Sequence, residues 1–222
     1  MDEDIAKSGL GRTPRRRRRL VHGDFERINL GKQYRGASIA SMPDSKAKEI
    51  LSRYCENIRE MVRSGSGLII GGAKGVGKTW AAAAVLKEAT RNSFPGYFVT
   101  HAELRELQFN DEEFGDGRDG VTVKFYLPKF RLLVLDGLDA AFLEDKAFGP
   151  LQLERLISRR NSAKLATIVT TRVGKRLTEK DGDFADLFDI MSETMFGLTI
   201  RGGNLREEQR KRLRARVTGG GE

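Results

Sequence analysis

Short apolar runs recur along the middle of the chain, and most are closed by Gly, Pro or polar residues. They are rich in Leu, Ile and Val, which is typical of buried strands. The pattern predicts five strands, at residues 67–70, 97–100, 131–136, 166–171 and 196–200.

Between these runs, apolar residues recur at steps of three and four, as on a helix with one buried face. The pattern predicts helices at residues 45–62, 80–88, 101–107, 151–160 and 184–191. Asp44 or Ser45 is a suitable N-cap for the first helix, and the Gly-rich residues 64–67 end it. Strands separated by helices indicate an α/β fold with a doubly wound parallel sheet.

Two features of the sequence do not predict a metal site. His101 has no Cys or His at metal-ligand spacing, so we expect a surface or capping histidine. Residues 110–120 are acidic and Gly-rich but do not fit a calcium loop, so we expect a surface loop.

Candidate chemistry begins directly after the first strand. Residues 72–79 fit the pattern G-x-x-x-x-G-K-[ST]. They lie between a predicted strand and a predicted helix, the order that a phosphate-binding loop requires. Its Lys would reach the β- and γ-phosphates, and its Thr hydroxyl would bind Mg²⁺. The alternative is a Gly-rich turn that carries Lys-Thr by chance. The predicted nucleotide-binding residues are Gly72, Ala73, Lys74, Gly75, Val76, Gly77, Lys78 and Thr79.

A second signal is Asp136, which ends the apolar strand 131–136. Carboxyl ends of parallel strands gather at one edge of a sheet, beside the phosphate-binding loop. Asp136 can therefore join Thr79 in holding Mg²⁺. The alternative is a buried strand followed by an Asp-Gly turn.

Basic residues cluster at both ends of a chain whose formal net charge is +9. Such clusters favour an anionic partner, most simply nucleic acid, although a solvated tail or a nuclear-localisation signal would also fit. We expect residues 1–42, which have little apolar content, to form a basic and flexible N-terminal arm, and residues 205–222 to form a basic tail. The predicted nucleic-acid contacts are Arg15, Arg16, Arg17, Arg18, Arg19, Arg210, Lys211 and Arg212.

The rest of the composition indicates the cellular compartment. The single Cys55 excludes an internal disulfide, fits a reducing cytosol and lies on the apolar side of a predicted helix, so we expect it in the core. No apolar run approaches the roughly 18 residues of a membrane span, and the acidic start lacks a signal sequence. We therefore expect a cytoplasmic protein without a membrane partner.

These motifs together resemble the AAA+ ATPases of the DnaC type, the bacterial and phage loaders of replicative helicases. The related IstB transposition ATPases share much of the pattern. The resemblance covers about Leu30 to Arg206. It rests on the phosphate-binding loop, the motif at residues 30–35, the Arg pair within residues 156–162, Thr170–Thr171 at the first sensor and residues 203–206 at the second.

The resemblance implies an AAA+ P-loop NTPase whose sheet order is 5-1-4-3-2, with the ATPase domain at residues 43–204. Thr171 would be the first sensor and Arg206 the second. ATP with Mg²⁺ would control a nucleotide-dependent homo-oligomer that binds single-stranded DNA and a replicative helicase, in a bacterium or a phage-infected host.

This chain departs from the family pattern in three ways. Gly137 follows the metal aspartate where the family has Asp or Glu, and the next carboxylate, Asp139, is displaced by two residues. Residues 189–193 lack the family's interfacial arginine, and the N-terminal arm is shorter than the family's helicase-binding domain. The first two changes remove groups that orient water or stabilise charge, so we expect a slow ATPase in which Asp139 substitutes.

Two other functions stay open from the sequence. One is a nucleic-acid-binding regulator that uses ATP as a structural ligand with little hydrolysis. The other is an IstB-like transposition ATPase.

Overall fold

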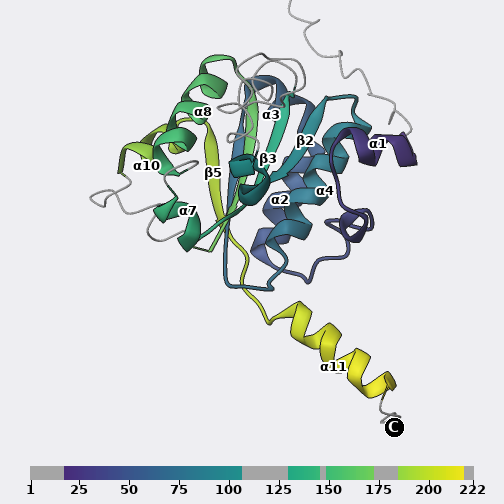
Figure 1. The fold of residues 1–222 in the computed structure, drawn as a ribbon. Coiled ribbons are helices and arrows are strands. Elements are labelled where there is room, and N and C mark those ends of the chain that lie inside the picture. The colour runs from purple at the N-terminus through teal and green to yellow at the C-terminus, as the bar shows by residue number, and fades with distance from the viewer. Residues whose placement is uncertain (1–17, 107–129, 146–148, 173–184, 218–222) are drawn as a thin grey trace, which may run out of the picture.

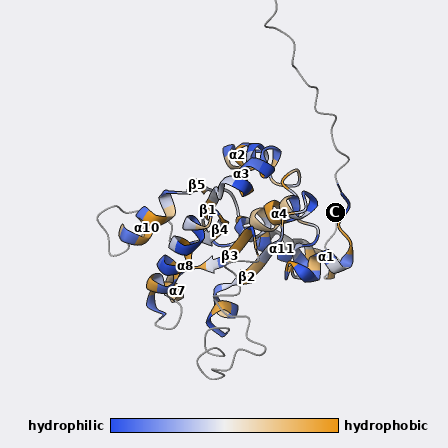
Figure 2. Cartoon of the chain, turned by 90° about the horizontal axis from the view of Figure 1, so that it is seen from above, coloured by the Kyte–Doolittle hydropathy of each residue, from blue (hydrophilic) through white to orange (hydrophobic). Residues whose placement is uncertain are grey.

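A parallel five-stranded sheet forms the centre of the computed structural model, which describes residues 18–106, 130–145, 149–172 and 185–217 (Figure 1). The strands are β1 (Gly67–Gly71), β2 (Gly96–Thr100), β3 (Leu132–Leu138), β4 (Ala166–Thr171) and β5 (Met195–Thr199). Their order is β2-β3-β4-β1-β5, which confirms the predicted order and can be followed in Figure 2. Every neighbouring pair is parallel.

Helices cover both faces of this sheet, as expected for a doubly wound fold (Figure 2). One face carries α2 (Lys46–Glu56), α3 (Ile58–Ser64) and α4 (Lys78–Arg91). The other carries α7 (Ala140–Glu144), α8 (Pro150–Ser162) and α10 (Ala185–Ser192). Successive strand residues point to opposite faces, so Leu68 and Ile70 enter one core and Ile69 the other.

The predicted helix at residues 45–62 is two helices, because the chain breaks at Asn57. Asn57 has a φ of −100° and a ψ of 19°, away from helical values, and its side chain shares the carbonyl oxygen of Arg53 with its own amide, at 2.9 Å and 3.1 Å. The predicted ends are confirmed. Ser45 accepts from the Lys48 amide at 3.2 Å, and Gly65 ends α3 with a φ of 82°.

Residues 18–42, the described part of the predicted N-terminal arm, pack against β2 and α4. They include α1 (His22–Arg27) and the short 3₁₀ helix η1 (Lys32–Tyr34). Their buried apolar residues are Ile28, Leu30, Ala37 and Met42. The carbonyl oxygen of Ile28 accepts from the Phe98 amide at 2.9 Å, so this segment also covers the exposed edge of β2.

Residues 101–106 are helical, but His101 is not a surface histidine. Its Nε2 lies 3.0 Å from Oδ2 of Asp145, and its side chain is 12% exposed. The ring also meets Phe142 edge to face at 5.5 Å. His101 therefore anchors the 101–106 helix to the end of α7. The predicted loop at residues 110–120 lies outside the described residues.

The last helix, α11 (Leu205–Val217), extends away from the sheet (Figure 1). Over the described parts of the chain, no helix has the length and apolar character needed to cross a membrane.

Candidate nucleotide-binding site

The loop between β1 and α4 has a backbone that only glycines adopt easily. Gly72 has a φ of 144°, and a Cβ there would lie 2.4 Å from the carbonyl oxygen of Ile200. Gly77 has a φ of 100° and is the N-cap of α4. The loop therefore wraps the N-terminus of a 14-residue helix, where free amides and the helix dipole favour a phosphate.

Lys78 is buried and folded back over this loop. Its Nζ donates to the carbonyl oxygens of Gly72 at 2.9 Å and Ala73 at 2.7 Å. Burial lowers the pKa of Lys78, and the charge of Arg172 lowers it further, whereas Asp136 acts in the opposite direction. Two carbonyl dipoles only partly compensate this ammonium group, so a phosphate would be a stronger partner.

Asp136 lies beside the start of α4, as predicted from the carboxyl ends of the strands. Its Oδ2 accepts from the Thr79 hydroxyl at 3.2 Å, and its Oδ1 accepts from the Thr170 hydroxyl at 2.6 Å. Burial raises the pKa of Asp136, although the bonds from Thr170 and Thr79 and the nearby cations lower it in part. The carboxylate is therefore a partly desolvated anion in need of a cation.

The side chains of Asp136 and Thr79 fit a magnesium ion. Carboxylate and hydroxyl oxygens are hard ligands of the kind that Mg²⁺ prefers, and Mg²⁺ usually completes its shell with water and substrate phosphates. Among the described residues, no three His, Cys, Asp or Glu side chains come together in a cluster that could hold a metal by itself.

Thr170 and Thr171, the residues predicted at the first sensor, both line the pocket, and the hydroxyl that faces Asp136 is that of Thr170. Neighbouring residues of β4 point to opposite faces, and Thr171 instead donates to the carbonyl oxygen of Leu138. Thr170 also accepts from the Gly137 amide at 3.0 Å. Thr170 is thus the β4 hydroxyl that contacts both Asp136 and the backbone of Gly137.

Asp139 and Arg172 form an ion pair at the mouth of the site. Asp139 follows β3, whereas Arg172 follows β4, so the pair joins the carboxyl ends of neighbouring strands. Gly137, which directly follows Asp136 in the sequence, has a φ of 85° and no side chain. Asp139 is therefore the carboxylate nearest along the chain to the metal aspartate, and it is already paired.

The start of α11 lies against the phosphate-binding loop. The Leu205 amide donates to the carbonyl oxygen of Gly75 at 3.1 Å, and a Cβ on Gly75 would overlap the Asn204 side chain. The charge of Arg206 contributes to the pKa shifts of both Lys78 and Asp136. Arg206 is thus close to the site, as predicted.

A pocket of about 1000 Å³ brings these groups together. Besides the loop, Asp136 and Arg206, its lining includes a wall from the N-terminal segment. The wall comprises Gln33, Tyr34, Ser41, Met42, Pro43 and Ser45. Its amphipathic surface beside a phosphate site is suited to a nucleoside base.

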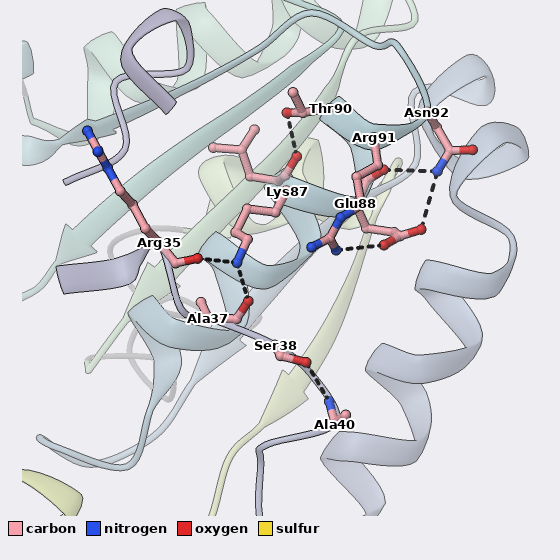
Figure 3. Close-up of polar contacts among 10 residues, drawn as sticks. Arg35, Ala37, Ser38, Ala40, Lys87, Glu88, Thr90, Arg91 and Asn92 are labelled. Carbon is pink, nitrogen blue, oxygen red and sulfur yellow. Dashed lines mark hydrogen bonds and ion pairs between the residues drawn. The ribbon is translucent and has the colours of Figure 1, made fainter. Parts of the chain in front are cut away.

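Two side chains of α4 hold this wall in place. Trp80 Nε1 donates to Ser41 Oγ at 3.2 Å and to the carbonyl oxygen of Ser38 at 3.4 Å. About two turns further along the helix, the buried Lys87 donates to the carbonyl oxygens of Arg35 and Ala37, the latter at 2.7 Å (Figure 3). The wall is therefore fastened to the same helix whose N-terminus carries Lys78 and Thr79.

The predicted nucleic-acid residues are only partly within the described chain. Arg15, Arg16 and Arg17 lie outside it, and Arg18 pairs with the buried carboxylate of Asp24 at 2.6 Å. Arg210 and Lys211 are exposed on α11, and the side chain of Arg212 is not described.

Sequence reasoning missed three parts of this site. Arg172 directly follows a strand, so the rule that identified Asp136 would have found it. Trp80 and Lys87 are seven residues apart on α4, which places them on one helix face. The wall itself has no regular apolar period and gave no signal.

The profile of the IstB-like ATP-binding protein family matches residues 14–193 of this chain. No curated protein matches the chain closely enough to count as a relative.

Among solved structures, similar folds belong to proteins of DNA replication. The DnaC helicase loader aligns at 23% identity, covering 77% of this chain and 100% of its own, with a TM-score of 0.62. DnaI aligns at 22% identity, covering 79% and 94%, with a TM-score of 0.59. The replication initiator DnaA, bound to AMPPCP and single-stranded DNA, aligns at 17% identity, covering 82% and 56%, with a TM-score of 0.61.

Proposed function

Because this chain belongs to the IstB-like ATP-binding protein family and has the AAA+ fold of the DnaC/IstB type, we propose that it binds ATP with Mg²⁺ between the phosphate-binding loop and Asp136. Lys78 would bind the β- and γ-phosphates, and Thr79 and Asp136 would hold the metal. The observation that carries this proposal is the 3.2 Å contact between Thr79 and Asp136 beside the buried Lys78 amine.

Calorimetry with Mg·ATP tests this site. Lys78→Ala should lower ATP affinity by about a hundredfold or more, since the phosphates lose their main charged partner. Arg59→Ala removes a cation from the exposed surface of α3 and should leave the affinity unchanged. Equal ATP affinity for Lys78→Ala and the wild type would overturn the proposal.

In the cell, the proposed role is that of a helicase loader or replication accessory, with ATP controlling a homo-oligomer on single-stranded DNA. The fold similarity to a helicase loader and to a DNA-bound replication initiator supports this role. The basic ends of the chain, residues 1–17 and α11, would contact the DNA phosphates around the ATPase body.

Size-exclusion chromatography with the host's purified replicative helicase tests the partner. A complex should form with ATP, and Lys78→Ala should abolish it. A chain that binds ATP but forms no helicase complex in any nucleotide state would not be a loader.

The second candidate is an IstB-like transposition ATPase, which the family match favours directly. ATP-dependent DNA binding that persists without any helicase complex would support it. A third outcome, ATP binding with no measurable turnover, would support a regulator that uses ATP as a structural ligand. The side-chain-free position at Gly137 favours that outcome.

A further inference from the structure

Arg172 enters the pocket beside the phosphate-binding loop. It follows Thr171, whose partner in the neighbouring strand is Gly71, the residue just before the loop. Arg172 lines the same pocket as Lys78 and Asp136. Its charge lowers the pKa of Lys78, so the two cations lie close enough to repel each other.

The ion pair between Arg172 and Asp139 is weak enough for Arg172 to exchange Asp139 for another anion. The Arg172 side chain is 46% exposed and that of Asp139 is 22% exposed, and pairs that water reaches contribute little to stability. Arg160 provides the contrast within this chain. It is fully buried and donates to Thr167, Phe130 and Ala166, so its position is fixed.

The pocket also carries an excess of positive charge. Its described lining contains Lys74, Lys78, Arg172, Arg201 and Arg206 but only two carboxylates, Asp136 and Asp139. A metal ion on Asp136 would leave Asp139 as the remaining carboxylate for these cations. A terminal phosphate would be a stronger partner for Arg172, because a guanidinium binds phosphate oxygens through two parallel hydrogen bonds.

We propose that Arg172 distinguishes ATP from ADP by exchanging its Asp139 partner for the terminal phosphate of ATP. This rests on the proposed nucleotide site. Asp139 competes with the nucleotide for the same guanidinium and keeps it neutralised when no γ-phosphate is present. The pair is thus a specificity determinant that forms only in the absence of ATP.

Two substitutions have opposite expected effects when Mg·ATP and Mg·ADP titrations are compared by calorimetry. Arg172→Gln should lower ATP affinity about tenfold or more and leave ADP affinity within about twofold. Asp139→Asn should raise ATP affinity about two- to fivefold, because it removes a solvated competitor. In the Arg172→Gln background, Asp139→Asn should have no further effect.

Controls separate this proposal from its premise and from a folding defect. Arg159→Gln, on the exposed face of α8, should change neither affinity. Thermal melting should show that each variant folds, and Arg172→Lys supplies a milder change that keeps the charge but loses the paired geometry.

Failure takes distinguishable forms. Equal losses of ATP and ADP affinity in Arg172→Gln, or no loss at all, would overturn the role of Arg172 while the nucleotide site stands. A fall in ATP affinity in Asp139→Asn would overturn the competition. A wild-type chain that binds neither nucleotide would overturn the proposed function itself.

Discussion

Thr170 in β4 donates a 2.6 Å hydrogen bond to Oδ1 of Asp136 in β3. This bond leaves Oδ2 turned toward the Thr79 hydroxyl at the start of α4. The carboxylate is therefore oriented by one strand and presented to the helix that begins the phosphate site. Holding it there costs stability, because burial raises its pKa and so disfavours the charged form.

Asp136→Asn should therefore stabilise the nucleotide-free protein at neutral pH and abolish Mg²⁺-dependent ATP binding. The folded-state pKa of Asp136 is raised above its ordinary value, so the cost is fully present above the folded-state pKa, declines as the pH falls through it and vanishes below the ordinary pKa. The difference in melting temperature between variant and wild type should accordingly shrink on acidification. Scanning calorimetry between neutral and acidic pH measures it.

Thr170→Val is a companion variant, since it keeps the shape of the Thr170 side chain and removes the hydroxyl that donates to Asp136. It should raise the pKa of Asp136 further and lower Mg·ATP affinity. A variant Asp136→Asn that melts below the wild type at neutral pH would show that the carboxylate stabilises the fold instead.

A second prediction concerns ATP turnover, which should be slow because Gly137 has no side chain to orient water. Asp139→Asn should lower turnover at saturating ATP even though it raises ATP affinity. Gly137→Glu should raise turnover and lower the melting temperature, since a φ of 85° costs about 1 kcal/mol or more for a residue with a side chain.

Phosphate release under saturating ATP measures both variants. A brisk wild-type rate that Asp139→Asn leaves unchanged would place the water-activating group elsewhere.

A third prediction concerns the pocket wall from the N-terminal segment and the buried Lys87 amine (Figure 3). Lys87→Met keeps the aliphatic stem but leaves the carbonyl oxygens of Arg35 and Ala37 without their donor. We expect a loss of about 2–3 kcal/mol in the free energy of unfolding. ATP affinity should fall about tenfold, with little change in the affinity for inorganic tripolyphosphate, because the wall would contact the base and not the phosphates.

Arg91→Gln is the matched control on the same helix, where the partly exposed Arg91 pairs with the buried Glu88 at 3.2 Å. It should leave both affinities unchanged. If Lys87→Met weakened ATP and tripolyphosphate equally, Lys87 would support the whole site and not the pocket wall alone.

Much of the sheet could be predicted because its strands are buried on both faces and therefore read as continuous apolar runs. The same rule placed Asp136, since polar residues that follow such runs meet at one edge. What could not be predicted depends on tertiary burial of polar groups. Arg160 is fully buried, and burial lowers its pKa to about 9, yet hydropathy assigns an arginine to the surface.

The N-terminal segment shows the same limit from the other side. Ile28, Leu30, Ala37 and Met42 are buried, but their spacing fits neither a helix nor a strand. Their burial depends on the β2 edge and on Lys87, which are far away in the sequence. Asn57 was likewise missed as a break because the apolar period continues across it into α3.

A fourth prediction concerns DNA. If residues 15–19 contact phosphates, replacing all five arginines by alanine should flatten the dependence of log affinity on log salt by about three units on a single strand. Arg18 already pairs with Asp24, so it should contribute least. Fluorescence anisotropy across a salt series measures the slope.

The control replaces Arg53, Arg59 and Arg63, exposed on α2 and α3, and should leave the slope unchanged. An unchanged slope in the variant at residues 15–19 would assign this run to an acidic protein partner instead.

The bond between Leu205 and the phosphate-binding loop has a mechanical consequence for α11. A helix of 13 residues is about 20 Å long, and this one is anchored at its first residue against Gly75. A tilt of about 10° at Asn204, caused by phosphates entering the loop, would carry Val217 through about 3–4 Å. Movements too small to alter the sheet would thus be amplified at the basic far end of α11, which would report the nucleotide state of the loop.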